Sequence, residues 1–378
     1  MGKIIHAQMD LSAKMEAFPY QREAFESVKD LPYSAIFHEQ GLGKTKIAID
    51  LLLYWLEKKD IDTVIVVTKK QLVQNWIDEF YQHTFLKPRV LGTNKQDNFY
   101  ILTSAVRVIV TNFEVFSSDK ERLSLFLKSR DVAVVVDEST KIKNPESKLA
   151  QDFFELSPLF KIKTIMTGTP VANRPYDIWS QIYFLDHGVS LGDDFASFKA
   201  HTNLTNDLGE CENKRIEFED SVSSIFDRIK HFTVRETKSS GIISLPEKKY
   251  MTIVCDMEQS QRDMYEQVRN EMSLAVRRGD TTIFDESQDS LKRLLRLVQI
   301  ASNPRLVDDS YDLLSGKEAR LDDILRDIIE YGERVIVWSS FIENVNYFYR
   351  KYQRYSPTRI HGKMSIEDRN ESVKRFKS

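Results

Sequence analysis

SAIFHEQGLGKTKIAIDLLLYWL, residues 34–56, holds three successive parts that decide the fold. A short and largely apolar run, SAIF (34–37), comes first, and the glycine-rich octet HEQGLGKT (38–45) follows it. A stripe of apolar residues at helical spacing then extends from Ile47 to Leu56. A run that is apolar on both faces predicts a buried parallel strand, and the stripe predicts an amphipathic helix. The order of strand, loop and helix is typical of one half of a βαβ unit.

Four more runs of this kind follow along the chain, separated by helical patterns. Because strands and helices alternate, residues 1–235 are predicted to form an α/β domain with a doubly wound parallel sheet. A helical insertion is expected at about 174–232. The further strands are expected at TVIVVT (63–68), RVIVTN (107–112), VAVVVDE (132–138) and KTIMTGT (163–169).

Residues 236–378 are predicted to hold a helical insertion at about 257–306 and the first part of a second α/β lobe, because strand and helix patterns alternate again after the insertion. Ser365 and Asp368 offer a capping box for the last helix. The elements expected after the insertion are a helix at 320–332, a strand at ERVIVWSSF (333–341), a helix at 341–353, a strand at TRIHG (358–362) and a helix at 365–376.

Length and composition limit the classes of protein to which this chain can belong. A chain of 378 residues is long enough for two compact lobes. Its 54 basic residues nearly cancel its 57 acidic ones, so a nucleic acid would have to bind a local patch. Cys211 and Cys255 are far apart and have no clustered histidines, which argues against a zinc site or a disulfide framework. The sequence has no signal peptide and no apolar run of membrane-spanning length. We therefore expect an intracellular protein without a membrane partner.

The octet at 38–45 has the composition of a phosphate-binding loop. Gly41 and Gly43 let the backbone turn tightly and aim its N–H groups inward, and the following helix adds its positive end. Lys44 would reach the β- and γ-phosphates, and the Thr45 hydroxyl would help to hold Mg²⁺. The simpler alternative is a glycine turn beside a surface lysine. The placement of the octet between a strand and a helix favours the phosphate-binding interpretation.

Two carboxylates end the most apolar predicted strand, VAVVVDEST (132–140). Ligands of open α/β sheets bind at the carboxyl ends of the strands. Asp137 is suited to hold Mg²⁺, and Glu138 to orient or deprotonate the water that attacks the γ-phosphate. The simpler alternative is a strand that ends in a solvated acidic turn, which is the correct interpretation of most Asp-Glu pairs taken alone. Two matching half-sites in one sheet make a nucleotide site the better interpretation.

Taken together, the motifs resemble those of superfamily-two, helicase-like ATPases of the SWI/SNF type, from Tyr20 to the end of the chain. HEQGLGKT is similar to the family's DEMGLGKT, with His38 at a position where the family itself departs from glycine. VVVDEST resembles its DEAH box, with Ser139 and Thr140 in place of Ala and His. MTGTPVANRPYDIWSQIYFL (166–185) resembles its third box. The resemblance implies two RecA-like lobes, ATP and Mg²⁺ as ligands, and Gln21 of PYQREAF as the residue that reads the adenine edge.

Other stretches resemble boxes that touch DNA in this family. They are VTKKQLVQNW (67–76), IVTNFEVF (109–116) and RIHGKMSIEDR (359–369). Trp76 belongs to the first stretch, although core packing is the better explanation for it. The resemblance implies movement along double-stranded DNA, with DNA contacts from Lys69, Lys70, Gln71, Thr111, Asn112, His361 and Gly362.

The family's boxes V and VI, which carry its arginine fingers, do not occur in this sequence. From that we expect weak to moderate ATP binding, very slow hydrolysis and no translocation by this polypeptide, either as a fragment or as a naturally short gene product. Two alternatives to a motor ATPase stay open, namely a non-catalytic, nucleotide-gated DNA-binding module and a P-loop kinase. Since no chromatin-reading or nuclear-targeting segment is recognised, a cytoplasmic protein of a bacterium or phage is the expectation.

Overall fold

The computed structural model describes residues 9–59, 61–171, 174–202, 212–241, 246, 248–277 and 283–378. The chain divides into two compact units, Met1–Pro246 and Glu247–Ser378. Each is described by itself.

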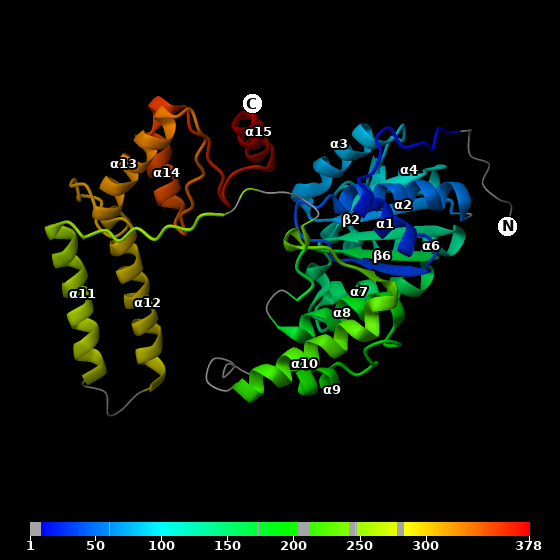
Figure 1. The fold of residues 1–378 in the computed structure, drawn as a ribbon, viewed down its shortest axis with the longest axis horizontal. Coiled ribbons are helices and arrows are strands. Elements are labelled where there is room, and N and C mark those ends of the chain that lie inside the picture. The colour runs from blue at the N-terminus through cyan, green and yellow to red at the C-terminus, as the bar shows by residue number, and fades with distance from the viewer. Residues whose placement is uncertain are drawn as a thin grey trace. The chain divides into compact units, whose positions relative to one another are not determined.

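The first unit is built on a seven-stranded sheet in the order β3-β4-β2-β5-β6-β1-β7, and every strand pair is parallel (Figure 1). The five predicted strands all form, although KTIMTGT ends as a strand at Met166. Two strands of two residues each, β3 and β7, were not predicted. The strands are β1 (Tyr33–Ile36), β2 (Thr63–Thr68), β3 (Arg89–Val90), β4 (Val108–Asn112), β5 (Val132–Asp137), β6 (Ile162–Met166) and β7 (Thr233–Val234).

Both faces of this sheet are buried, because successive side chains of a strand point to opposite sides. Val64 and Val66 of β2 pack into one apolar cluster, whereas Ile65 and Val67 pack into another. Helices α1, α2 and α3 cover the first face, and α5, α6, α7 and α8 cover the second (Figure 1). The predicted doubly wound parallel sheet is therefore confirmed.

The helices of the first unit include the two that the apolar stripes predict, α2 and α3. None of the helices in the described part of the chain has the length and apolar character needed to cross a membrane. The helices of this unit are α1 (Pro19–Val28), α2 (Lys44–Lys58), α3 (Val73–His83), α4 (Lys95–Thr103), α5 (Phe113–Ser118), α6 (Lys120–Ser129), α7 (Lys148–Leu156), α8 (Trp179–Asp186), α9 (Phe195–Thr202) and α10 (Glu212–Ile229).

Helices make up the regular structure of the second unit. One of the two bonds of the predicted capping box is present at α15, where the Ser365 hydroxyl accepts a hydrogen bond from the Asp368 backbone N–H. The helices are α11 (Gln259–Arg277), α12 (Ile283–Ser302), α13 (Gly316–Glu330), α14 (Ile342–Lys351) and α15 (Ile366–Lys377).

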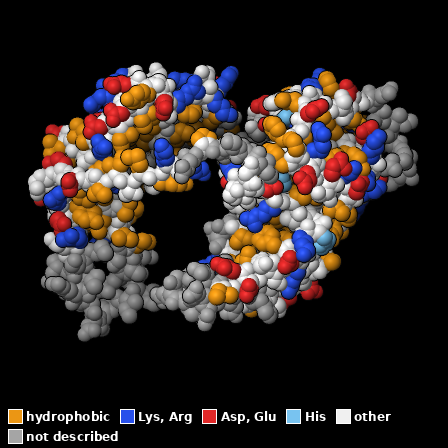
Figure 2. All heavy atoms as spheres, viewed as in Figure 1, with side chains coloured by type: hydrophobic (Ala, Val, Ile, Leu, Met, Phe, Trp, Pro, Cys, Tyr) orange, Lys and Arg blue, Asp and Glu red, His pale blue; other side chains and the backbone are white. Residues whose placement is uncertain are grey.

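The strands predicted at 333–341 and 358–362 are wrong for this structure. Both segments are irregular, and residues 248–277 and 283–378 contain no strand. A strand is stable only when a neighbour takes up its backbone hydrogen bonds, and neither segment has such a neighbour here. Ile336 and Trp338 are consequently exposed, Trp338 to 89%. Figure 2 shows hydrophobic side chains gathered on the visible face of this unit.

A buried carboxylate ties the helices of the second unit together. Glu318 of α13, 2% exposed, accepts hydrogen bonds from Arg305 at 2.9 Å, from Lys351 of α14 at 2.8 Å and from the Tyr347 hydroxyl. Burial by itself would raise the pKa of Glu318, but these partners outweigh it and the pKa lies below its usual value.

Candidate active site

The loop at 38–45 turns at two glycines with left-handed backbone, Gly41 (φ +85°) and Gly43 (φ +67°). Gly43 is the N-cap of α2, so the first turn of this 15-residue helix points its free N–H groups at the loop. A side chain at either glycine would be strained, and at Gly43 it would also collide with a neighbour. The loop thus has the form of an anion cradle.

Gln21 of α1 is the neighbour that excludes a side chain at Gly43. A Cβ atom added there would lie 2.2 Å from Nε2 of Gln21. The Gln21 amide is 4% exposed, donates to the Leu42 carbonyl at 3.4 Å and accepts from the Phe18 backbone N–H at 2.9 Å. Gln21 therefore braces the loop from the side of α1.

Lys44, the first residue of α2, lies across the loop. Its Nζ donates to the carbonyl of His38 at 3.0 Å and to that of Glu39 at 3.4 Å. Burial lowers the pKa of Lys44, while the charges of Asp137 and Glu138 act in the opposite direction. A Cβ atom at Gly168 would lie 3.4 Å from the Lys44 Nζ, so TGTP borders the same cradle.

His38 begins the loop as a buried side chain. It is 2% exposed, and its Nδ1 atom has no hydrogen-bond partner among the described residues. Burial lowers its pKa from the usual value of 6.5. The histidine is accommodated in the core beside Tyr20, with ring centroids 6.4 Å apart, and leaves the loop glycines in place.

Asp137 ends β5 and is held by two donors. Its Oδ2 accepts from the Thr68 hydroxyl at 3.0 Å and from the indole N–H of Trp76 at 2.8 Å. Burial raises the pKa of Asp137, and these two hydrogen bonds act against that shift. Trp76 is a core residue, as expected, but it also orients this carboxylate.

Glu138 follows with a left-handed backbone (φ +57°), which is uncommon for a residue other than glycine. Its Oε2 accepts a hydrogen bond from the Lys69 Nζ at 3.0 Å. Lys69 comes directly after β2, the strand next to β5. Lys69, a predicted DNA contact, is thus paired with Glu138, a predicted catalytic residue.

The predicted nucleotide residues all lie at the carboxyl edge of one sheet or against it. Asp137 and Glu138 follow β5, and the loop follows β1; β6 lies between these two strands. The half-buried Thr45 is in the first turn of α2. The set suits ATP with Mg²⁺, because Mg²⁺ takes one or two protein oxygens and completes its shell with water and substrate phosphates.

The predicted DNA residues are placed in three different settings. Lys70 and Gln71 are exposed at the same edge of the sheet. The Thr111 hydroxyl donates to the Leu91 carbonyl at 3.3 Å, and Asn112 caps α5 by accepting from the Val115 backbone N–H at 2.9 Å. Both of these side chains are buried.

The remaining two predicted DNA residues, His361 and Gly362, belong to the second unit. Gly362 is exposed, and its carbonyl accepts a hydrogen bond from Arg369 at 2.8 Å. Neither ring nitrogen of the half-buried His361 has a hydrogen-bond partner among the described residues.

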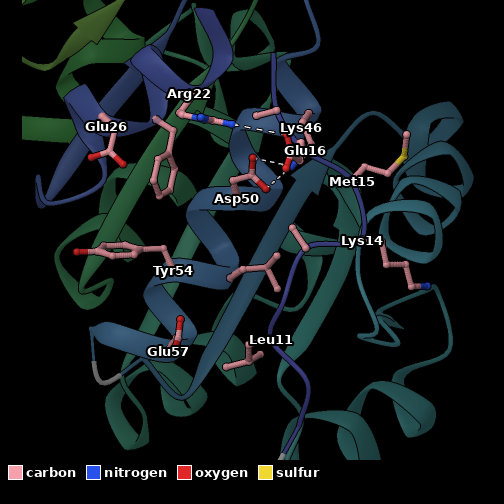
Figure 3. Close-up of a pocket in the computed structure, with 14 residues that line it drawn as sticks. Leu11, Lys14, Met15, Glu16, Arg22, Glu26, Lys46, Asp50, Tyr54 and Glu57 are labelled. Carbon is pink, nitrogen blue, oxygen red and sulfur yellow. Dashed lines mark hydrogen bonds and ion pairs between the residues drawn. The ribbon is translucent and has the colours of Figure 1, made fainter. Parts of the chain in front are cut away.

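A separate pocket of about 450 Å³ lies along the outer side of α1 and α2 (Figure 3). Its most buried cation, Lys46, is already paired with Asp50, at 2.7 Å from Oδ2. Glu16, Glu26 and Glu57 also line it and would repel a phosphate. The loop is therefore the better anion site of the two.

Three contributors to the site were not predicted as such: Thr68, Gly168 and Lys238. Lys238 lies against the loop, and its backbone N–H donates to Oε2 of Glu39 at 2.8 Å. Thr68 and Gly168 stand in stretches that resemble boxes of the family, 67–76 and 166–185, but only the folded structure shows that they border this site. For Trp76, the polar N–H of a buried indole was the available signal, because it usually finds a partner.

Two protein-family models match the chain. The model of the SNF2-related domain matches residues 31–306, and that of the helicase conserved C-terminal domain matches residues 316–378. The predicted family resemblance is confirmed, and the P-loop kinase alternative is wrong.

Curated relatives come from eukaryotes and bacteria. The mouse "SWI/SNF-related matrix-associated actin-dependent regulator of chromatin subfamily A member 1" is 27% identical over 365 residues, covering 89% of this chain and 32% of the relative. An "Uncharacterized ATP-dependent helicase" of Mycoplasma pneumoniae is 25% identical over 337 residues, covering 87% and 30%. The chain thus spans about a third of the length of these relatives.

A solved structure also resembles this one. The "Sulfolobus solfataricus SWI2/SNF2 ATPase core in complex with dsDNA" aligns with a TM-score of 0.53 and 22% identity, over 98% of this chain and 78% of that chain. The likeness confirms the predicted fold class.

Proposed function

Because this chain belongs to the SNF2-related family of helicase-like ATPases, we propose that it binds ATP with Mg²⁺ and forms the N-terminal portion of a motor that couples ATP hydrolysis to movement along double-stranded DNA. The observation that carries the proposal is the convergence of Lys44, Asp137 and Glu138 at one edge of the sheet, beside a loop that requires glycine. Each feature alone has a simple structural explanation. Their combination supports an ATPase site.

We assign the phosphates to the loop. The backbone N–H groups around Gly41 and Gly43 would bind the phosphate oxygens, helped by the positive end of α2. Lys44 would exchange its two carbonyl partners for the β- and γ-phosphates. A carbonyl is a weaker partner for an ammonium group than a phosphate, so this exchange is favourable. Gln21 is proposed to contact the adenine edge from its position beside the loop.

We assign the metal to Asp137 and Thr45, and the water to Glu138. Mg²⁺ would neutralise charge on the β- and γ-phosphate oxygens. Thr68 and Trp76 keep Asp137 in one orientation, which limits the cost of forming the site. Glu138 would accept a proton from the attacking water, or orient it, once its oxygen is released from Lys69.

We propose double-stranded DNA as the partner, bound in part by Lys69, Lys70 and Gln71. Lys70 and Gln71 are exposed, as a phosphate contact requires. Thr111 and Asn112 would contribute through the local backbone, because their side chains are engaged internally. His361 and Gly362 of the second unit are proposed as further contacts.

We propose that residues 1–235 and 236–378 act as two RecA-like lobes, with helical insertions at about 174–232 and 257–306. The ranges of the two family models, 31–306 and 316–378, support a bipartite motor. A cytoplasmic location in a bacterium or a phage-infected cell stays a prediction, since relatives occur in both eukaryotes and bacteria.

Two measurements test the proposal together. ATP turnover should be very slow, should rise when duplex DNA is added, and should lose this rise in Glu138→Gln. DNA affinity should fall with salt, with a log-log slope of about −0.9 for each phosphate neutralised. Turnover that ignores DNA, or DNA affinity that ignores salt, would contradict the proposed coupling.

A further inference from the structure

The segment at 233–238, here called the connecting segment, is hydrogen-bonded along the strand that leads into the loop. β7 pairs in parallel with β1, with Thr233 opposite Ala35 and Val234 opposite Ile36. The pairing continues beyond both strands. The Phe37 N–H donates to the Val234 carbonyl, and the Glu39 N–H to the Glu236 carbonyl, each at 2.8 Å. The segment therefore follows the chain into the loop itself.

Lys238 ends this segment against the glycine turn. A Cβ atom added at Gly41 would lie 3.5 Å from the Lys238 Nζ and 3.6 Å from its Cε. The end of the Lys238 side chain thus lies within van der Waals distance of the position of a Cβ atom at Gly41. Its cation lies next to the loop backbone that we assign to phosphate.

Two ammonium groups consequently meet at one anion cradle. Lys44 approaches from α2 and Lys238 from the connecting segment, and Lys238 is close enough to act on the pKa of Lys44 in the lowering direction, after burial as the main cause. Two cations held near each other repel, unless an anion lies between them. The arrangement suits a polyphosphate better than a single carboxylate.

We propose that Lys238 is a second phosphate-binding cation of this site, which contacts the β- or γ-phosphate of a bound nucleoside di- or triphosphate. The inference rests on the proposed nucleotide site and adds a residue to it.

The present partner of Lys238 is easily exchanged. The Lys238 Nζ lies 3.9 Å from Oε1 of Glu39, and the two side chains are 32% and 41% exposed. Exposed ion pairs at such distances contribute little to stability. A polyphosphate carries more charge than one carboxylate, so it would displace Glu39. The backbone N–H of Lys238 can stay on Glu39, which keeps the segment in place during the exchange.

This exchange would link nucleotide binding to the position of the connecting segment. The connecting segment lies shortly before the boundary between the two units at Pro246. A cation that moves to the phosphates would fix the end of this segment to the occupied loop. Nucleotide binding at the loop would then restrict the motion of the connecting segment.

The test is equilibrium binding of ATP, ADP and AMP to the full chain in the presence of Mg²⁺. We expect Lys238→Gln to weaken ATP and ADP binding about 5- to 20-fold, the usual effect of losing a charge-assisted hydrogen bond, and to leave AMP binding unchanged. Lys238→Arg should retain most of the affinity. Lys230→Gln is the matched control, because Lys230 lies in the same unit, is 73% exposed and pairs only loosely with Asp227 at 3.2 Å.

Two further variants separate the possible failures. Glu39→Gln removes the competing charge but keeps an oxygen for the Lys238 backbone N–H, so it should raise ATP affinity. Lys44→Ala reports on the site itself. If Lys44→Ala weakens ATP binding while Lys238→Gln does not, the role of Lys238 is overturned and the site stands. If wild type and Lys44→Ala bind ATP equally, the proposed site is overturned as well.

Discussion

The Nζ atom of Lys69 lies 3.0 Å from Oε2 of Glu138 and donates a hydrogen bond to it. This ion pair joins a residue proposed to touch DNA to the residue proposed to handle the attacking water. A carboxylate that accepts from an ammonium group has one oxygen fewer for water. If Lys69 binds DNA as proposed, a DNA phosphate and Glu138 would compete for the same lysine.

We predict that Lys69→Met raises ATP turnover without DNA and reduces the further stimulation by saturating duplex DNA, because Glu138 is already released. The steady-state rates with and without DNA measure both effects. Lys70→Met is the control, since it removes an exposed neighbouring cation that is not bonded to Glu138. A lower basal rate in Lys69→Met, with an unchanged stimulation ratio, would show that the pair merely positions Glu138.

We predict that Trp76 influences the Mg²⁺ concentration that ATP binding requires, in addition to its role in core packing. Trp76→Phe removes the indole N–H that holds Asp137 at 2.8 Å. We expect a loss of roughly 1–3 kcal/mol in the free energy of unfolding and a rise of about tenfold in the Mg²⁺ concentration needed for ATP binding. The matched variant is Trp55→Phe, at a fully buried tryptophan whose N–H donates to the Lys29 carbonyl at 3.1 Å. It should lose stability alone, and equal Mg²⁺ requirements for the two variants would argue against the orienting role.

Gly43→Ala should weaken ATP binding by about tenfold or more, because alanine is strained at φ +67° and its Cβ atom would displace the Gln21 amide from its place beside the loop. Gly192→Ala introduces the same left-handed strain (φ +86°) in open space, so it should cost stability without changing ATP affinity. If both single glycine variants bind ATP as wild type does, the loop is not the cradle.

Lys163 provides a test that depends on pH. Burial lowers its pKa from 10.5 to about 8, and its Nζ donates to Ser157 at 2.9 Å. Between about pH 8 and pH 10.5 the unfolded chain holds more protons at this position than the folded one, so unfolding becomes less favourable as the pH rises. Below pH 8 the cost of burying the charge is fully present.

The expected result is that wild type gains thermal stability relative to Lys163→Met between pH 7.5 and 9.5, by about a few degrees in the midpoint of unfolding. Taking the difference between the two proteins removes the effect of other titrating groups. A difference that stays constant over this range would mean that Lys163 keeps an ordinary pKa.

The first unit could be predicted because its information is local. VAVVVD and TVIVVT are apolar on both faces, so burial on both sides requires a central parallel strand. The glycines, Lys44, Asp137 and Glu138 also stand in short motifs whose chemistry follows from residue type. β3 and β7 were missed because two residues carry no periodic pattern. β7 forms only because Thr233 and Val234 find β1 across the fold.

Prediction of strands from residue composition fails in the second unit. VIVW (335–338) has a strand's composition, but it lacks a neighbouring strand in this structure and stays irregular. Likewise, the contacts of Thr68, Trp76 and Lys238 with the site join residues that are far apart in sequence. Spacing along the chain does not encode which side chains meet, so these contacts require the folded structure.

The most direct test of the central claim is the affinity of the full chain for Mg²⁺ and ATP, compared with that of Lys44→Ala and Asp137→Asn. We predict that wild type binds ATP, that Lys44→Ala weakens binding about tenfold or more, and that Asp137→Asn removes the dependence on Mg²⁺. Equal ATP affinity in all three proteins would contradict the account.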